Sequence, residues 1–214
     1  MARLLSEVRF GSLLVYSPRG ASEVSRRSRS IRDAVKAGRR EVLEAAARRA
    51  LEPATRTRLA EFLDSGRVLV PAPRSAPLAD GALWPAERVC EVLVRHGLGS
   101  ETARLLRRTE SVPKSAFCLP GERPTAGRHF ATMAAEPLLQ YSDARLTLVD
   151  DVVTKGSTLL AAASRLAEAY PHAEIRVFAL LRTRGLIPEI EAILQPCVGR
   201  IALVREEEAD RFDG

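Results

Sequence analysis

The chain has 214 residues, of which 46% are hydrophobic and 28% are charged, a composition typical of one globular domain with a sizeable extension. No apolar run approaches the roughly 18 residues of a membrane-spanning helix, and the N-terminal segment mixes acidic and basic residues, so we expect neither a membrane partner nor a secretory signal. The three cysteines have no CxxC spacing, which argues against a disulfide framework and a zinc ribbon and favours the reducing cytoplasm.

The net charge of +6 is unevenly placed along the chain. Residues 1–66 contain 14 Lys and Arg against 8 Asp and Glu, whereas the rest of the chain is balanced. Such a basic segment suits nucleic acid or an acidic partner, and residues 19–58 are the candidate surface. The favoured alternative is an arginine-rich solvated helix face, because aromatic residues that would stack on bases are absent there.

The N-terminal part of the chain predicts a strand followed by helices. The apolar spacing and the positions of glycine, proline and capping residues set the expected bounds. In chain order we expect one or two short strands over residues 8–18, a polar loop over 19–30, a helix over 31–51 capped by Ser30, and a shorter helix over 54–63.

From residue 67 onward, strands alternate with helices, which predicts an α/β fold with a central, mostly parallel sheet flanked by helices. Residues 67–214 would form this core, and residues 1–66 a strand and helical extension packed on it. The expected strands cover residues 67–73, 146–151, 174–183 and 199–206, and the expected helices cover 84–99 and 158–170. Segment 101–108 fits either a helix or a strand. We expect residues 109–128 to form a long loop able to act as a lid, and residues 205–214 to form a loose tail.

The stretch LTLVDDVVTKGST, residues 146–158, carries the strongest chemical pattern. A buried strand ends on Asp150 and Asp151, and a glycine-containing loop leads into the next helix. Ligands of open α/β sheets bind at such crossings, and a helix N-terminus suits a phosphate. The aspartates, repelled by the phosphate, would accept hydrogen bonds from ribose hydroxyls. The predicted phosphate-binding residues are Val153, Thr154, Lys155, Gly156, Ser157 and Thr158.

This stretch resembles the phosphoribosyl pyrophosphate (PRPP) motif of type I phosphoribosyltransferases. The segments VLVPAPRS (68–75) and ERPTAGRHFA (122–131) look most like the competence-associated, ComF-type branch of that family. Two departures stand out. Lys155 replaces a hydroxyl residue, which strengthens phosphate binding or marks an altered ligand, and the zinc-binding cysteine cluster common at the N-terminus of that branch is missing.

The resemblance implies an enzyme that transfers a phosphoribosyl group from PRPP to a nitrogenous acceptor such as a nucleobase, or the reverse. It implies Mg²⁺ as cofactor, held through PRPP and by Asp150 and Asp151, and it suggests a homodimer. Thr154 stands where oxopurine-salvage relatives carry an acidic residue, which argues against that subclass. The implied catalytic residues are Asp150, Asp151 and Arg123, and the implied pyrophosphate-binding residues are Ala72, Pro73, Arg74, Ser75, Lys114 and Arg128.

Two other functions remain open at this point. The first is a non-catalytic PRPP- or nucleotide-binding protein with a role in regulation or nucleic-acid handling, which the Lys155 departure and the concentrated basic charge favour. The second is a nucleoside-monophosphate-binding module with hydrolytic activity, for which no water-activating base is evident in the sequence.

Overall fold

A seven-stranded sheet runs through the centre of the molecule in the order β3-β2-β6-β7-β1-β8-β9. The structure is a computed structural model that describes residues 4–113, 123–185 and 189–214. The five strands from β3 to β1 are mutually parallel, and β8 and β9 add antiparallel at one edge. The expected α/β class with a mostly parallel sheet is therefore confirmed. The strands are β1 (Glu7–Tyr16), β2 (Val68–Pro71), β3 (Glu101–Thr102), β6 (Arg145–Val153), β7 (Glu174–Thr183), β8 (Leu194–Leu203) and β9 (Ala209–Asp213).

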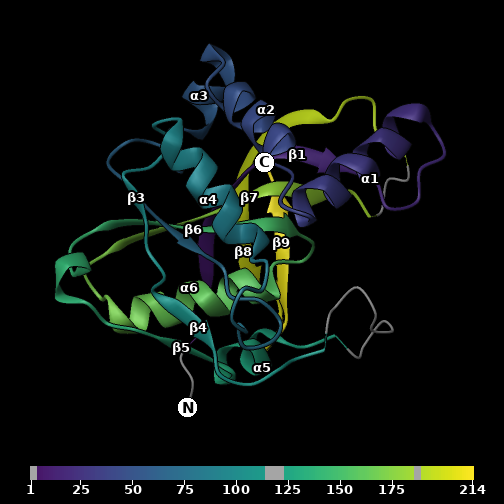
Figure 1. Ribbon diagram of the computed structural model, residues 1–214. Helices are drawn as coiled ribbons and strands as arrows, with labels where there is room; N and C mark the ends of the chain where they lie inside the picture. The colour runs from purple at the N-terminus through teal and green to yellow at the C-terminus, as the bar shows by residue number, and fades with distance from the viewer. Residues whose placement is uncertain (1–3, 114–122, 186–188) are drawn as a thin grey trace.

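Helices cover both faces of this sheet (Figure 1). One face carries α1 (Glu23–Lys36), α2 (Arg40–Ala50), α3 (Pro53–Leu59) and α4 (Pro85–Arg95). The other face carries α5 (Ala126–Ala131), α6 (Ser157–Ala169), a short 3₁₀ helix η1 (Leu139–Tyr141), and a two-stranded ribbon of β4 (Leu106–Arg108) and β5 (Met133–Ala135). Among the described residues, no helix has the length and apolar content needed to cross a membrane.

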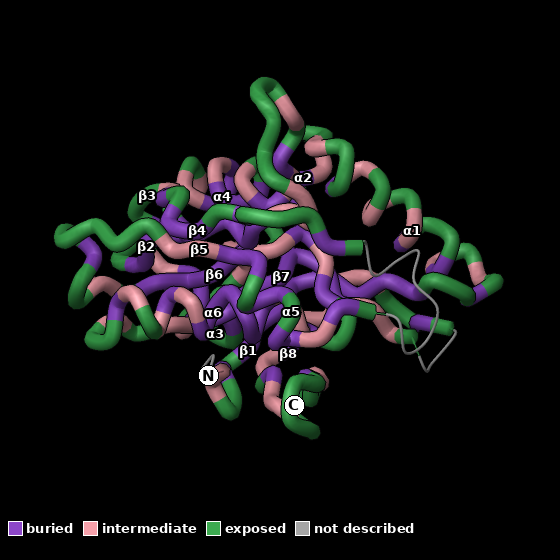
Figure 2. The backbone as a smooth tube through the Cα atoms, turned by 90° about the horizontal axis from the view of Figure 1, so that it is seen from below, coloured by how far each residue is buried: buried purple, intermediate pink, exposed green. Residues whose placement is uncertain are grey.

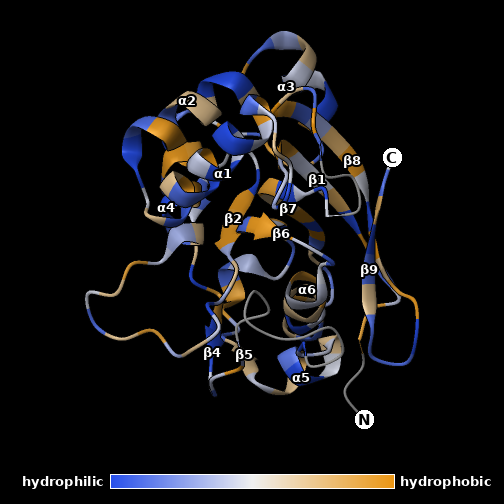
Figure 3. Ribbon diagram, turned by 90° about the vertical axis from the view of Figure 1, so that its right-hand side faces the viewer, coloured by the Kyte–Doolittle hydropathy of each residue, from blue (hydrophilic) through white to orange (hydrophobic). Residues whose placement is uncertain are grey.

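The core consists of two apolar layers, one on each side of the sheet. Leu146 and Leu148 of β6 pack in the layer that contains α6, and Val149 packs in the layer beneath the N-terminal helices. A strand that is buried on both faces has a continuous run of apolar residues in its sequence. Figure 2 shows the buried backbone in the middle of the molecule, and Figure 3 shows the hydrophobic colour concentrated in β2 and β6.

The N-terminal helices differ from the prediction. The polar segment 19–30, expected to be a loop, forms most of α1, and the expected helix over 31–51 is two helices. Gly38, with φ of 65°, lies between them. The helix begins at Ser22 instead of Ser30, because the Ser22 side chain accepts a hydrogen bond from the Ser25 amide and so satisfies one of the unpaired first-turn donors.

The two ends of the chain both contribute strands to the main sheet. Strand β1 is a single ten-residue strand between β7 and β8, so part of segment 1–66 lies inside the sheet of the expected core. The expected loose tail over 205–214 is wrong, because β9 pairs antiparallel with β8 from Ala209 to Asp213. Segment 101–108 contains β3 and the first strand of the ribbon, β4.

Candidate functional site

The candidate site lies where β6 crosses into α6, in the middle of the sheet. Strand β6 pairs with β2 on one side and β7 on the other, and Pro71, the last residue of β2, pairs with Val149 in the middle of β6. Because the carboxyl ends of parallel strands meet at one edge, the segment after β2 and the segment after β6 lie next to each other there. The amide of Ala72 donates to the Val149 carbonyl at 2.8 Å, which holds the start of the segment after β2 against β6.

The loop between β6 and α6 leaves the helix N-terminus open. Gly156 is the N-cap residue with φ of 97°, a left-handed conformation that favours glycine. The backbone amides of Ser157, Thr158 and Leu159 have no hydrogen-bond acceptor among the residues that the structure describes. These amides lie at the positive end of a 13-residue helix, an arrangement that suits an anion such as a phosphate.

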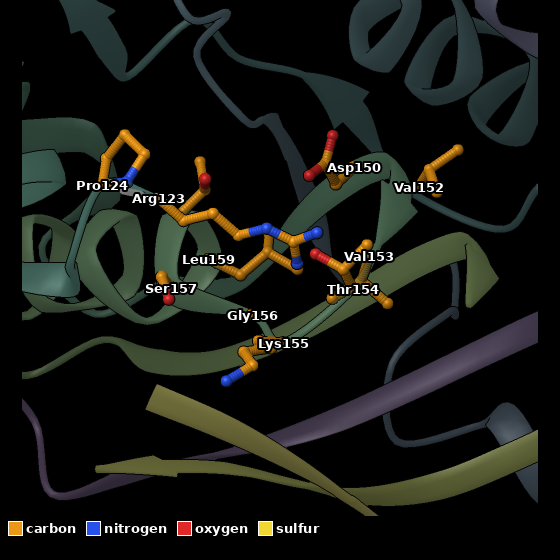
Figure 4. Close-up of a pocket in the computed structure, with 11 residues that line it drawn as sticks. Arg123, Pro124, Asp150, Val152, Val153, Thr154, Lys155, Gly156, Ser157 and Leu159 are labelled. Atoms are coloured by element: carbon orange, nitrogen blue, oxygen red, sulfur yellow. The ribbon is translucent and has the colours of Figure 1, made fainter. Parts of the chain in front are cut away.

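A surface pocket opens over this loop, and it combines the helix terminus with one carboxylate. Figure 4 shows the Arg123 side chain crossing the pocket toward Thr154, whereas the Lys155 side chain points away from Arg123. The pocket thus places one guanidinium group and the side chain of Asp150 close to the free amides. Its lining residues are Arg123, Pro124, Asp150, Val152, Val153, Thr154, Lys155, Gly156, Ser157, Thr158 and Leu159.

The two adjacent aspartates do not share this pocket. Asp150 lines it, whereas Asp151 does not and is buried with 8% of its surface exposed. Burial raises the pKa of Asp150 well above its usual range, and the Asp151 carboxylate raises it further. The carboxylate of Asp151 forms an ion pair with Lys36 of α1, with a distance of 2.9 Å between Nζ and Oδ2.

Lys36 is a site residue that the sequence analysis missed. Burial lowers the pKa of Lys36, but the Asp151 carboxylate and the hydrogen bond to it more than offset this effect, so the net shift is upward. The ammonium group is therefore charged at neutral pH. No motif marks a lone lysine at the end of an arginine-rich helix, because its proximity to Asp151 spans 115 positions of the chain.

A second set of missed residues links the pocket to the segment after β2. The Thr158 hydroxyl lies 3.2 Å from Nε2 of His129, whose Nδ1 lies 3.4 Å from the Arg108 guanidinium. Burial, followed by the charge of Arg108, lowers the pKa of His129 to about 4. Nε of Arg108 donates to the Arg74 carbonyl at 2.8 Å. The network thus ties the first turn of α6 to the predicted pyrophosphate loop.

The predicted pyrophosphate residues lie beside the pocket and not in it. Pro73 and Arg74 line a neighbouring cavity together with Trp84, Arg107 and Arg108. Ala72 is buried, and the Ser75 carbonyl accepts a hydrogen bond from the Val112 amide. Burial lowers the pKa of Arg108 to about 10, and no carboxylate among the described residues pairs with this guanidinium.

A second predicted cation, Arg128, has no place in the pocket. Arg128 forms an exposed ion pair with Glu110 at 3.6 Å and lines neither cavity. Lys114 lies outside the described residues. Of the two described cations predicted from the long loop, Arg123 is therefore the one that the structure brings to the phosphate-binding segment.

The described residues offer no cage for a metal ion. No group of three or more His, Cys, Asp or Glu side chains in the described ranges is arranged to hold one. Of the two aspartates, Asp151 already has an ammonium partner. Because Mg²⁺ is usually held by one or two carboxylates together with substrate phosphates and waters, Mg²⁺ held through PRPP with Asp150 and Asp151 stays a prediction, and at Asp151 the ion would compete with Lys36.

Among known proteins, the chain has a weak structural match and no sequence match. No family model matches the chain, and no curated protein matches it. Among solved structures, the chain matches adenine phosphoribosyltransferase from Leishmania tarentolae with 17% identity, coverage of 80% of this chain and 83% of the other, and a TM-score of 0.28. A TM-score this low does not support an assignment of function. No family match supports the ComF-type branch that the loops predicted.

Proposed function

We propose that the chain is a phosphoribosyltransferase that binds PRPP across the pocket between β6 and α6. The observation that carries the proposal is the open N-terminus of α6, with the free amides of Ser157, Thr158 and Leu159 beside the Asp150 side chain. Anion donors next to a hydroxyl acceptor match a phosphorylated sugar. The PRPP-like motif over residues 146–158 supports the same assignment.

Each part of the pocket has a role that follows from its chemistry. The amides at the start of α6 would bind the 5′-phosphate, and Asp150 would accept hydrogen bonds from the ribose hydroxyls. As the bond from the anomeric carbon to pyrophosphate breaks, positive charge grows on the sugar and negative charge on the leaving group. Arg123 in the pocket and Arg74 in the neighbouring cavity would stabilise the negative charge that grows on the leaving group.

Magnesium has a limited place in this proposal. When bound with PRPP it would offset charge on the pyrophosphate, and most of its ligands would be phosphate and water oxygens, because the described residues form no cage of three or more ligands. We therefore assign the sugar contact to Asp150 itself. Hydroxyl donors favour the ionised form of a carboxylate, so binding would release a proton from Asp150, and sugar-phosphate affinity would rise with pH.

Isothermal titration with PRPP and with ribose 5-phosphate tests the proposal. We expect both to bind to the wild-type protein, and Asp150→Asn to weaken binding at least about tenfold, since a hydrogen bond to a charged acceptor is lost. The matched control is Asp143→Asn, because Asp143 is an exposed aspartate outside the pocket. A folded wild-type protein that binds neither ligand would refute the proposal.

A pyrophosphate-release assay with a panel of nucleobases separates transfer from binding alone. Release with at least one base, abolished in Asp150→Asn, is the expected result. Tight PRPP binding with no release for any base would instead identify the chain as a non-catalytic PRPP-binding protein, the alternative that the Lys155 departure favours.

A further inference from the structure

Helix α1 ends on a lysine that reaches the carboxyl end of β6. The Nζ atom of Lys36 lies 2.9 Å from Oδ2 of Asp151. The Lys36 side chain is 51% exposed, whereas that of Asp151 is 12% exposed. The carboxylate is thus largely closed off from solvent, while about half of the lysine side chain that covers it remains exposed. Burial of a carboxylate without a partner is costly, so the pair depends on this contact.

The position of α1, and therefore of Lys36, is held by several contacts. The guanidinium group of Arg29 donates to the carbonyl groups of Ser17 and Gly20 at 3.0 and 2.8 Å. The Ser22 cap fixes the start of the helix. A tethered cation in a fixed position loses little entropy when it interacts with a ligand or a carboxylate, in contrast to a metal ion taken from solution.

The titratable groups that act on Lys36 come from two strands. Asp151 and Asp150 on β6 both act on it, as does Tyr16 at the end of β1. Among the described residues, Lys36 is the partner in the one ion pair formed by Asp151, and Asp150 forms none. A divalent ion seated at Asp151 would have to displace the ammonium.

We propose that Lys36 is a built-in cation that takes the place of a divalent metal ion at the paired aspartates. It neutralises the carboxylate that a metal would need, and it keeps a positive charge at the edge where the sugar phosphate binds. Lys36 is thus a positioning residue that acts through Asp151. It also gives one residue of the basic N-terminal segment a role that requires no nucleic acid.

The first test measures metal binding without any organic ligand and is independent of the proposed function. Free Mn²⁺ is titrated by electron paramagnetic resonance against the full chain. We expect Lys36→Met to bind Mn²⁺ at least about tenfold more tightly than the wild type, because Asp151 becomes free. The double variant Lys36→Met with Asp151→Asn should lose this gain. Equal affinity of wild type and Lys36→Met would overturn the proposal.

The controls keep this test decisive. Arg27→Met removes a positive charge from the same helix at an exposed residue and should leave Mn²⁺ affinity unchanged. Asp151→Asn alone should also leave it unchanged, because the carboxylate is already occupied in the wild type. This variant decides the matter even if Lys36→Met does not fold, since a drop in Mn²⁺ affinity on Asp151→Asn would overturn the proposal.

The second test concerns the ligand and rests on the proposed function. Ribose 5-phosphate is titrated in EDTA and in Mg²⁺. We expect wild-type affinities within about twofold of each other, and Lys36→Met to lose about tenfold in EDTA and to recover in Mg²⁺. Binding by the wild type only with Mg²⁺ would overturn the inference. Absence of binding in both conditions would instead refute the proposed function and leave the Mn²⁺ result to decide the inference.

Discussion

Gly156 is the residue on which the open helix terminus depends. Its φ of 97° favours glycine, and a Cβ atom added there would lie 2.7 Å from Cγ2 of Ile201 on β8. Two separate constraints, one in the backbone and one in the packing, therefore act at the same position. Both must be met for the amides of the first turn to face the pocket.

We expect Gly156→Ala to lower the free energy of unfolding by about 2 kcal/mol, because it combines backbone strain with a steric clash. The affinity of the same variant for ribose 5-phosphate should also fall, because the first-turn amides would no longer face the pocket. Gly97→Ala is the matched control, since Gly97 has φ of 70° but no atom within 4 Å of the added Cβ. Urea unfolding measures both, and an equal loss in the two variants would show that Ile201 plays no part.

His129 makes the stability of the molecule depend on pH. Its pKa is lowered to about 4 by burial and then by the charge of Arg108, so the folded state holds fewer protons than the unfolded state between about pH 4 and pH 6.5. The stabilising contribution is therefore present above pH 6.5 and is lost as the pH falls through this window.

His129→Gln should flatten this pH dependence, because an amide does not titrate but can still contact Thr158 and Arg108. We expect the wild type to lose at most about 3 kcal/mol more than the variant between pH 7 and pH 4. Urea unfolding at steps across this range gives the difference. The exposed His172 provides the control His172→Gln, which should follow the wild type; identical curves for His129→Gln and wild type would contradict the prediction.

At the scale of a secondary-structure element, the start of α1 is tied to a distant acidic residue. Glu189 accepts hydrogen bonds from the Ala21 amide at 2.5 Å, the Ser22 amide at 3.1 Å and the Ser25 hydroxyl at 2.9 Å. Hydrogen bonds from Ser22, followed by that from the Ala21 amide, lower its pKa to about 2. A negative charge at a helix N-terminus is also favourable for the helix dipole.

We expect Glu189→Gln to destabilise α1 at neutral pH and to lower the melting temperature by a few degrees. The wild-type advantage should be complete above the usual glutamate pKa of about 4.5 and should vanish as the pH falls toward 2. Thermal melts from pH 7 to pH 3 measure it. Glu191→Gln, which changes an acidic residue two positions along the chain, is the control, and an equal effect there would contradict the prediction.

At the scale of the whole molecule, the N-terminal segment and the core form one sheet. Strand β1 pairs in parallel with β7, from Phe10 opposite Val177, and antiparallel with β8, from Glu7 opposite Ala202. Phe10 and Leu13 are fully buried. Removal of an interior strand exposes two rows of backbone groups and the apolar surface that it covered.

A fragment of residues 67–214 should therefore fail to fold cooperatively, although it contains the whole PRPP-like motif. Circular dichroism melts and size-exclusion chromatography would show a broad transition and aggregation. Co-expression with a separate peptide of residues 1–66 should restore a compact complex, since it supplies β1. A fragment that melts sharply alone would contradict the prediction and would favour a boundary near residue 66.

The sequence predicted the elements whose signal is local. The apolar run of β6 and the periodicity of α6 identified the strand and helix around the motif, and the alternation of strands and helices predicted the α/β class. The local pattern gave a wrong prediction for α1, a polar helix that is stabilised by residues far away in the sequence. Segment 19–30 looked like a loop because the contacts that stabilise it, such as that between Ser25 and Glu189, span 164 positions.

By itself, then, the sequence determined the class of the fold and the segment that bears the chemistry, because hydrophobic period and motif spacing act between neighbouring residues. Only the tertiary structure decided that the adjacent aspartates have different surroundings, with Asp150 in the pocket and Asp151 paired with Lys36. It likewise placed β1 in the middle of the sheet. The physical reason is that charge pairing and strand order depend on which distant segments meet, and no local pattern encodes that.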